Sequence, residues 1–358
     1  MNQTPARARE LGIAPGRYPT GLLDAITDVP GVLVGQTTVT REPDLHTGVT
    51  AIVPEVLHER KALPAGLFVG NGYGKLVGAT QLAELGEIET PIVLTGTLSA
   101  FRAADALVTW MLSLPGNEEM RSVNPVVGET NDGFLSDIRS RPITERHVLE
   151  ALSVASGGAV VEGCVGAGTG TSALGFKAGM NTSSRRVDMP DLRRDVTVGV
   201  LVQANFGGTL TVLGVPIEKE PALSFAGVSE PNADVERGNS CMIVVATDAP
   251  LDSRQLTRLA TRAVFGMARV GSAYTHGSGD YGIAFSVGDG EPVPGRAMDP
   301  LFVAVQEAVE EAILNALFMA ETTYGVDGHV RFAVPHDYVV EACGERGIAL
   351  VRPRPLTP

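Results

Sequence analysis

Short runs rich in valine, isoleucine and threonine recur along the chain, and they constrain its fold more than any other feature. Such residues favour strands, and clusters of glycine, proline and other turn-forming residues separate the runs. Helical patterns lie between some of them, at residues 99–114 and 143–156. Strands are expected at residues 31–39, 47–53, 66–69, 91–94, 196–203 and 241–246.

The last third of the chain contains the clearest helical patterns. After Asp252, apolar residues return at the spacing i, i+3, i+4 and i+7, as on one buried face of a helix. Gln255 lies three residues after Asp252, which is typical of a capped helix start. A second helix is expected to begin with Asp299 as N-cap and Pro300 at the first helical position. With a strand expected at 281–287 between them, this order favours helices packed outside stacked sheets.

Composition excludes several classes of protein. The chain is 44% hydrophobic and 19% charged, whereas disordered chains have low hydrophobicity and high charge. Its 28 basic and 41 acidic residues give a net charge of −13, which argues against a nucleic-acid or anionic-membrane partner. The start has no apolar signal region and no run is long enough to span a membrane, so a cytoplasmic location is expected. No repeat or linker divides the chain, and we expect one domain over residues 1–358.

The glycine-rich segment at residues 163–179 is the densest local feature. Residues 168–173 match the looser dinucleotide-binding fingerprint, but Gly175 and Gly179 interrupt the helix that this fingerprint must open. We interpret the segment as a place where backbones approach closely near a pocket. The six histidines lack metal-binding spacings, and the three cysteines are far apart without a C-x-x-C pair. Neither a metal nor a cofactor is expected, and the thiols are expected to stay reduced.

Two loops carry residues suited to hydrolysis, although no G-x-S-x-G motif is present. Residues 276–280 bring a histidine, a hydroxyl and a carboxylate onto one loop, which is either a catalytic group or a polar turn. At Asn239–Ser240 a polar loop changes abruptly into an apolar strand. A serine hydroxyl at such a step can attack the preceding carbonyl, and hydrolysis of the resulting ester frees an α-amine. That amine titrates near pH 8 and can serve as a general base. The alternative interpretation is that Asn239–Ser240 is an ordinary turn before a strand and is not cleaved.

Several collinear segments together resemble one family of self-processing hydrolases. They include GNGYGKLVG at 70–78, GETNDGFLSD at 128–137, GAGTGTSALGFKAGMNTSSR at 166–185, VLVQANFG at 200–207, GNSCMIVVATDAPL at 238–251 and HGSGDYGIAF at 276–285. The chain resembles the L-aminopeptidase/D-esterase–amidase and β-peptidyl aminopeptidase family, of the DmpA type. The resemblance implies a four-layer α-β-β-α sandwich, in which two stacked mixed sheets are flanked by helices.

The resemblance also implies the residues that carry the reaction. Ser240 matches the nucleophile, which would be released by cleavage between Asn239 and Ser240 into chains of residues 1–239 and 240–358. Ser278 and Asp280 match the second serine and its acidic partner, which is glutamate in some relatives. Asn205 matches the asparagine on the oxyanion side.

Three residues of the GETNDGF segment are the expected substrate-binding residues. Glu129 is a candidate to hold the free amine of the substrate, because a carboxylate favours an ammonium group. Asn131 belongs to the same segment. Phe134 occupies the position of a tyrosine that some relatives place near the oxyanion.

The function that the resemblance implies is hydrolysis of the amide or ester bond after the N-terminal residue of short peptides or aminoacyl amides. The expected assembly is a homotetramer of processed heterodimers. One alternative is an acyltransferase of the ornithine acetyltransferase type, and another is a hydrolase of linear non-peptide amides. A third is a non-catalytic binding protein, which would remain a single uncut chain.

Overall fold

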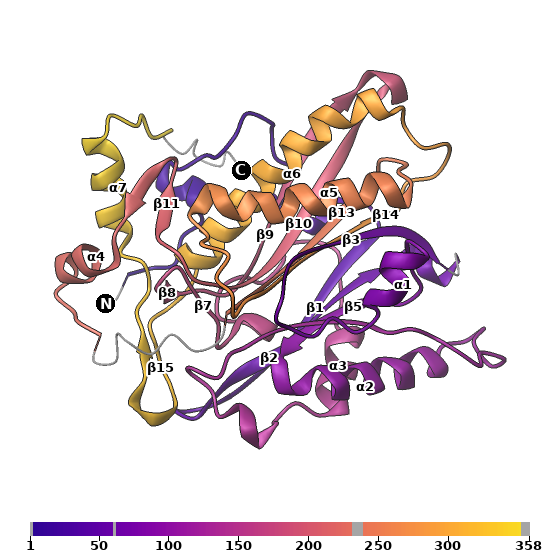
Figure 1. The fold of residues 1–358 in the computed structure, drawn as a ribbon, viewed down its shortest axis with the longest axis horizontal. Coiled ribbons are helices and arrows are strands. Elements are labelled where there is room, and N and C mark those ends of the chain that lie inside the picture. Colours follow the sequence, from indigo (N-terminus) through magenta and orange to yellow (C-terminus); the bar gives the residue numbers. More distant parts are fainter. Residues whose placement is uncertain (1–2, 60–61, 231–238, 352–358) are drawn as a thin grey trace.

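The computed structural model describes residues 3–59, 62–230 and 239–351, and two stacked β-sheets form its centre (Figure 1). The six-stranded sheet has the order β4-β3-β14-β13-β10-β9 and the four-stranded sheet the order β1-β2-β5-β6. The strands of the larger sheet are β3 (Leu63–Gly72), β4 (Glu87–Ile88), β9 (Met180–Met189), β10 (Arg194–Asn205), β13 (Ser240–Thr247) and β14 (Gly279–Ser286). Those of the smaller sheet are β1 (Val32–Arg41), β2 (Leu45–Pro54), β5 (Ile92–Gly96) and β6 (Val126–Thr130).

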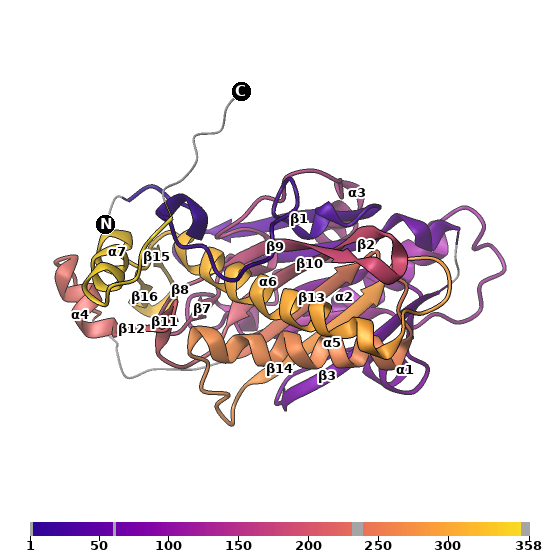
Figure 2. The same cartoon turned by 90° about the horizontal axis from the view of Figure 1, so that it is seen from above.

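Helices cover the outer face of each sheet. The larger sheet packs against α5 (Ser253–Gly266) and α6 (Asp299–Phe318), and the smaller against α2 (Ala100–Ser113) and α3 (Glu145–Ser153). Both sheets are mixed, because β13 runs parallel to β14 and β5 parallel to β6 among otherwise antiparallel pairs. Figure 2 shows the same layers from above. The predicted four-layer α-β-β-α sandwich is confirmed.

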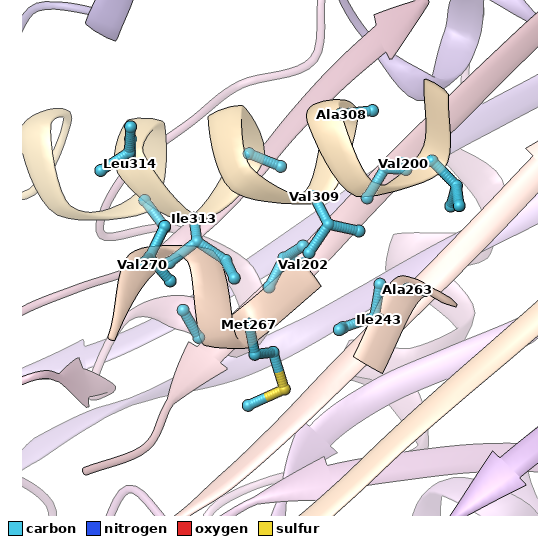
Figure 3. Close-up of a cluster of buried hydrophobic side chains, with 14 of the residues drawn as sticks. Val200, Val202, Ile243, Ala263, Met267, Val270, Ala308, Val309, Ile313 and Leu314 are labelled. Atoms are coloured by element: carbon cyan, nitrogen blue, oxygen red, sulfur yellow. The ribbon is translucent and has the colours of Figure 1, made fainter. Parts of the chain in front are cut away.

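Strand β13 has an apolar sequence because both of its faces are buried. Successive side chains of a strand point to opposite sides. Cys241 and Ile243 therefore pack into the core beneath α5 and α6, where Ile243 lies close to the helices (Figure 3). Met242 and Val244 belong to the second core, which lies between the two sheets. This alternation also decides which way the polar residues at the end of the strand point.

The start of α5 agrees with the prediction from the sequence, whereas the start of α6 differs from it. The Asp252 carboxylate accepts a hydrogen bond from the Gln255 N–H at 2.7 Å, which confirms the predicted cap of α5. Asp299 is the first residue of α6, and Met298 is its N-cap. The expectation for Asp299 was wrong because a 3-10 turn at Gly295–Met298 runs directly into the helix.

The glycine-rich segment does not open a helix. It passes through a 3-10 turn at Gly166–Gly168 into the short hairpin of β7 (Ser172–Ala173) and β8 (Phe176–Lys177). A Cβ placed on Gly170 would lie 2.1 Å from the His46 carbonyl oxygen. The segment is thus a close crossing of backbones, as predicted, and a side chain at Gly170 would force this crossing apart.

Most of the remaining elements gather at one end of the sandwich, whereas the short helix at Ala79–Glu84 packs against β3 (Figure 1). In the part of the chain that the structure describes, no helix is both long and apolar enough to cross a membrane. The further helices are α1 (Ala79–Glu84), α4 (Lys219–Phe225) and α7 (His336–Glu345), and the further ribbons pair β11 (Leu210–Val212) with β12 (Val215–Ile217) and β15 (Thr323–Tyr324) with β16 (Val330–Arg331).

Candidate active site

Ser240 is the first residue of β13 and is 2% exposed. Its Cα lies opposite that of Asn205, the last residue of β10, in the antiparallel pairing of these strands. Directly opposed residues project from the same face of a sheet. Ser240 and Met242 are two positions apart in the strand, so their side chains point to the same face. Met242 belongs to the core between the sheets, so this face is turned toward the second sheet. The serine hydroxyl and the asparagine amide therefore share one buried side of a strand end.

Two hydrogen bonds fix the orientation of the Asn205 amide. Its Oδ1 accepts from the Ser172 N–H at 2.9 Å, and its Nδ2 donates to the Asn131 carbonyl oxygen at 3.0 Å. The side chain of Asn131 is engaged locally, since its Oδ1 accepts from the Gly133 N–H at 2.9 Å. Asn131 thus holds Asn205 through its backbone.

Ser278 and Asp280 form a buried pair beside the start of β13. The Ser278 hydroxyl donates to Asp280 Oδ1 at 2.7 Å, and Asn71 Nδ2 donates to Asp280 Oδ2 at 2.9 Å. In the parallel pairing of β13 with β14, Asp280 lies opposite Cys241, the residue after Ser240. The structure therefore brings the predicted serine and its acidic partner together. Asp280 lies on the neighbouring strand, opposite the residue that follows the predicted nucleophile.

The Asp280 carboxylate lies on the helix-covered side of the sheet. Its register partner Cys241 belongs to the core beneath α5 and α6. Burial raises the pKa of Asp280, and hydrogen bonds from Ser278 and Asn71 oppose this rise because they favour the charged form. The Asp280 carboxylate and the Ser240 hydroxyl thus lie on opposite faces of the sheet. Both are close to the beginning of β13.

Glu129 reaches the same region from the other sheet and is 2% exposed. Its Oε1 accepts from the Lys75 N–H at 2.8 Å, and Lys75 Nζ lies 3.5 Å from the same oxygen. Its Oε2 is buried and has no hydrogen-bond partner among the described residues. A Cβ on Gly74 would lie 3.3 Å from both Glu129 Oε1 and the Gly279 Cα, so Glu129 lies near the start of β14. A buried carboxylate oxygen in this position is suited to accept a hydrogen bond from an ammonium group.

Phe134 is buried beside the side chains of His329 and Arg331. Its ring stacks on His329 with centroids 4.4 Å apart, and the Arg331 guanidinium carbon lies 3.7 Å from the ring centroid. The His329 ring Nδ1 is 2.7 Å from the Phe134 carbonyl oxygen. The ring has no polar atom, so its contribution here is shape and packing. Neither His329 nor Arg331 was given a role from the sequence, because only the fold brings them against Phe134.

Two other residues near the site were also missed. Asn71 belongs to a glycine-rich loop, and nothing in the sequence around it indicates a catalytic role. The pairing of β3 with β14 brings it next to Asp280. Asp132 follows Asn131 and is 2% exposed, and both of its carboxylate oxygens are buried without a hydrogen-bond partner in the described parts of the chain. Among the same residues, no group of three or more histidine, cysteine, aspartate or glutamate side chains could hold a metal ion.

Asp132 is expected to make the folded state less stable as the pH rises. Burial raises its pKa from 3.8 to about 6, so the folded protein holds this proton more tightly than the unfolded chain does. Its stabilising effect is complete below about pH 4 and is lost as the pH rises through about 6, which amounts to about 3 kcal/mol. In the uncut Ser240→Ala background, Asp132→Asn should match the protein with Asp132 at pH 4 and be more stable at pH 8, as measured by urea unfolding.

The difference between the two proteins isolates this carboxyl, because every other titrating group is common to both. Equal differences in unfolding free energy at pH 4 and pH 8 would show that Asp132 titrates normally.

Known proteins match this chain along nearly its whole length. The sequence profile of peptidase family S58 matches residues 24–331. The β-peptidyl aminopeptidase BapA of Sphingosinicella xenopeptidilytica is 39% identical, with 92% of this chain and 89% of that protein covered. The solved L-aminopeptidase D-Ala-esterase/amidase of Ochrobactrum anthropi is 35% identical with a TM-score of 0.85, over 95% and 99% of the two chains. A β-aminopeptidase from Burkholderia sp. is 36% identical with a TM-score of 0.83, over 96% and 99%.

Proposed function

This chain belongs to peptidase family S58 and is an aminopeptidase, and we propose that its nucleophile is Ser240, made N-terminal by cleavage of the Asn239–Ser240 bond. The observation that carries this proposal is the position of Ser240 at the buried beginning of β13, opposite Asn205. A strand end leaves room for a new chain terminus without breaking the interior of the sheet. The chains released would comprise residues 1–239 and 240–358.

In the self-cleavage step, the Ser240 hydroxyl oxygen attacks the Asn239 carbonyl carbon. The C–N bond breaks as the acyl group moves to the oxygen, and the nitrogen takes the proton. Water then hydrolyses this ester, leaving a carboxylate on Asn239 and a free α-amine on Ser240. An α-amine titrates near pH 8, so about a tenth of it is neutral and able to act as a base at pH 7.

In turnover, the Ser240 α-amine takes the proton from its own hydroxyl as that oxygen attacks the carbonyl of the substrate's first residue. The proton passes to the leaving amine, and water releases the acyl group from Ser240. Asp280 lies on the opposite face from the hydroxyl but beside the strand end. We assign Ser278 and Asp280 to orienting the α-amine, because Asp280 lies opposite Cys241, next to the strand end at which this amine would form.

The free amine of the substrate is assigned to Glu129. Its buried Oε2 has no hydrogen-bond partner among the described residues, and its carboxylate lies near the start of β14. An aminopeptidase needs such a group, because it must recognise an unblocked N-terminus. Asn131 positions Asn205, and Phe134 shapes this side of the site through its packing.

Paired substrates with and without a free amine test this proposal. Aminoacyl p-nitroanilides and β-dipeptides should be hydrolysed, and the matching N-acetylated compounds should not. Equal hydrolysis of blocked and unblocked compounds would exclude recognition of the amine. Acetyl transfer from acetylornithine is not favoured, because the relatives that match are peptidases. The same amide panel should include linear non-peptide amides.

Asn205 is assigned to the oxyanion, since its amide is held in a fixed orientation opposite Ser240. Asn205→Ala is expected to lower kcat of the processed enzyme by about 10²- to 10³-fold, with a smaller change in KM, because the lost donor acts mainly in the transition state. Steady-state kinetics on a purified, fully processed sample measures this. A loss confined to KM would instead assign Asn205 to ground-state binding.

We further propose that the protein is cytoplasmic and that processed heterodimers assemble as a homotetramer. Light scattering of the processed enzyme would measure the second point directly, and a monomeric mass would exclude it.

A further inference from the structure

Asn239, the residue on the acyl side of the proposed cleavage site, is held by a side-chain contact. Its Nδ2 donates to the Thr275 hydroxyl oxygen at 3.0 Å. The Asn239 side chain is attached one bond away from the carbonyl carbon that Ser240 must attack. A hydrogen bond that holds this side chain therefore restricts the orientation of the scissile carbonyl.

The backbone of Thr275 has a separate role in the same region. Its carbonyl oxygen accepts from the Ser278 N–H at 3.0 Å and from Asn71 Nδ2 at 3.4 Å. The same Asn71 nitrogen donates to Asp280 at 2.9 Å. The Thr275 carbonyl thus supports the Ser278–Asp280 pair, while its hydroxyl contacts the chain that the cleavage would separate from Ser240.

We propose that Thr275 is a positioning residue for self-cleavage alone, whereas Asn71 positions Asp280 for both self-cleavage and turnover. This inference rests on the proposed function. Once the Asn239–Ser240 bond is broken, the carbonyl that Thr275 helped to orient has already reacted, and its hydroxyl has no further part in the reaction. Asn71, by contrast, donates to Asp280, which stays beside the beginning of β13 after cleavage.

Asn71 holds the Asp280 carboxylate by the oxygen that Ser278 does not contact. Ser278 occupies one carboxylate oxygen and Asn71 the other. Removing the Asn71 amide would leave Oδ2 without this donor and free the carboxylate to rotate away from Ser278.

Thr275→Val tests the division of roles, because valine has nearly the same shape and keeps the backbone carbonyl. Cell-free synthesis followed by denaturing electrophoresis would measure conversion of the 358-residue precursor. The loss of one neutral hydrogen bond should slow conversion by about 3- to 10-fold. After complete conversion, kcat and KM should equal those of the unchanged enzyme within about 2-fold, and Thr275→Ser should restore the conversion rate.

Asn71→Ala should behave differently, with slower conversion and a lower kcat of the processed enzyme at nearly constant KM. The double variant Thr275→Val with Asn239→Ala should convert no more slowly than the slower single variant, since the two single changes break the same hydrogen bond. Conversion of Thr275→Val at the normal rate would overturn the proposal. An equal loss in conversion and turnover would also overturn it, because Thr275 would then be a general structural residue.

These outcomes are distinct from failure of the proposed function. If the unchanged protein is never cleaved, or if Ser240→Ala is still cleaved, the proposed nucleophile is wrong whatever the Thr275 variants do.

Discussion

Ser240→Ala is expected to remain a single chain of 358 residues with no aminopeptidase activity, whereas the unchanged protein yields chains of 239 and 119 residues. Alanine removes the oxygen that attacks Asn239, so no α-amine is released. The same oxygen is the nucleophile of turnover, so the two losses occur together. Intact mass spectrometry and hydrolysis of an aminoacyl p-nitroanilide measure both. Activity should fall by at least about 10³-fold, as expected when a nucleophile is removed.

Two further variants separate chemistry from folding. Ser253→Ala changes a serine at the first position of α5, away from the site, and should be processed normally. Ser240→Cys retains a nucleophilic atom at the same place and should show some cleavage, because a thiolate attacks carbonyl groups. An uncut Ser240→Ala protein with full activity would refute the assignment of Ser240 and would require a different nucleophile.

The sequence predicted the layer that carries the nucleophile because its elements have strong periodic patterns. The order β13, α5, β14 and α6 agrees with apolar runs and with one buried helix face after Asp252. Strand β9 was not expected, since its sequence MNTSSRRVDM is polar although most of its residues are buried. Such a strand is stable only with partners for its polar groups, and those partners come from distant segments. Local pattern carries no information about them.

In the site, too, the sequence predicted what local motifs carry and missed what depends on contacts between distant segments. The motifs around Ser240, Ser278 and Asp280 could be aligned with a known pattern from sequence alone. The contact of Asn71 with Asp280 spans 209 residues along the chain and depends on the register of β3 with β14. A register is set by packing over whole strands, and an irregularity lies directly after Asp280. Thr275 was passed over for the same reason, because its value depends on where Asn239 lies in space.

Arg185 in β9 is the residue whose removal should most destabilise the fold. Its side chain is completely buried. Arg185 Nη2 contacts Glu311 Oε2 at 2.6 Å, and its Nε lies 3.6 Å from Glu307 Oε2. Its Nη1 lies 3.7 Å from Asp24 Oδ1. This one guanidinium therefore links the N-terminal segment, β9 and α6 through three carboxylates.

Arg185→Met should lower the free energy of unfolding by about 3–5 kcal/mol, because it removes the buried cation that neutralises Glu307 and, together with Arg9, Glu311. Urea unfolding in the Ser240→Ala background measures this on a single uncut chain. Arg186→Met on the same strand is the matched control, since the Arg186 side chain is 54% exposed and pairs with half-exposed Asp195. Its effect should stay within about 0.5 kcal/mol.

Removing the acid together with the arginine tests the cause of the loss. In Arg185→Met with Glu311→Leu, the most closely paired carboxylate disappears, and Arg9, its other partner, is 37% exposed and can turn to solvent. The double variant should therefore regain part of the stability that Arg185→Met loses, since an apolar pair avoids the desolvation of two charges. Strictly additive losses would mean that Arg185 acts through packing volume, and the burial of unpaired carboxylates would not be the reason that β9 needs its arginine.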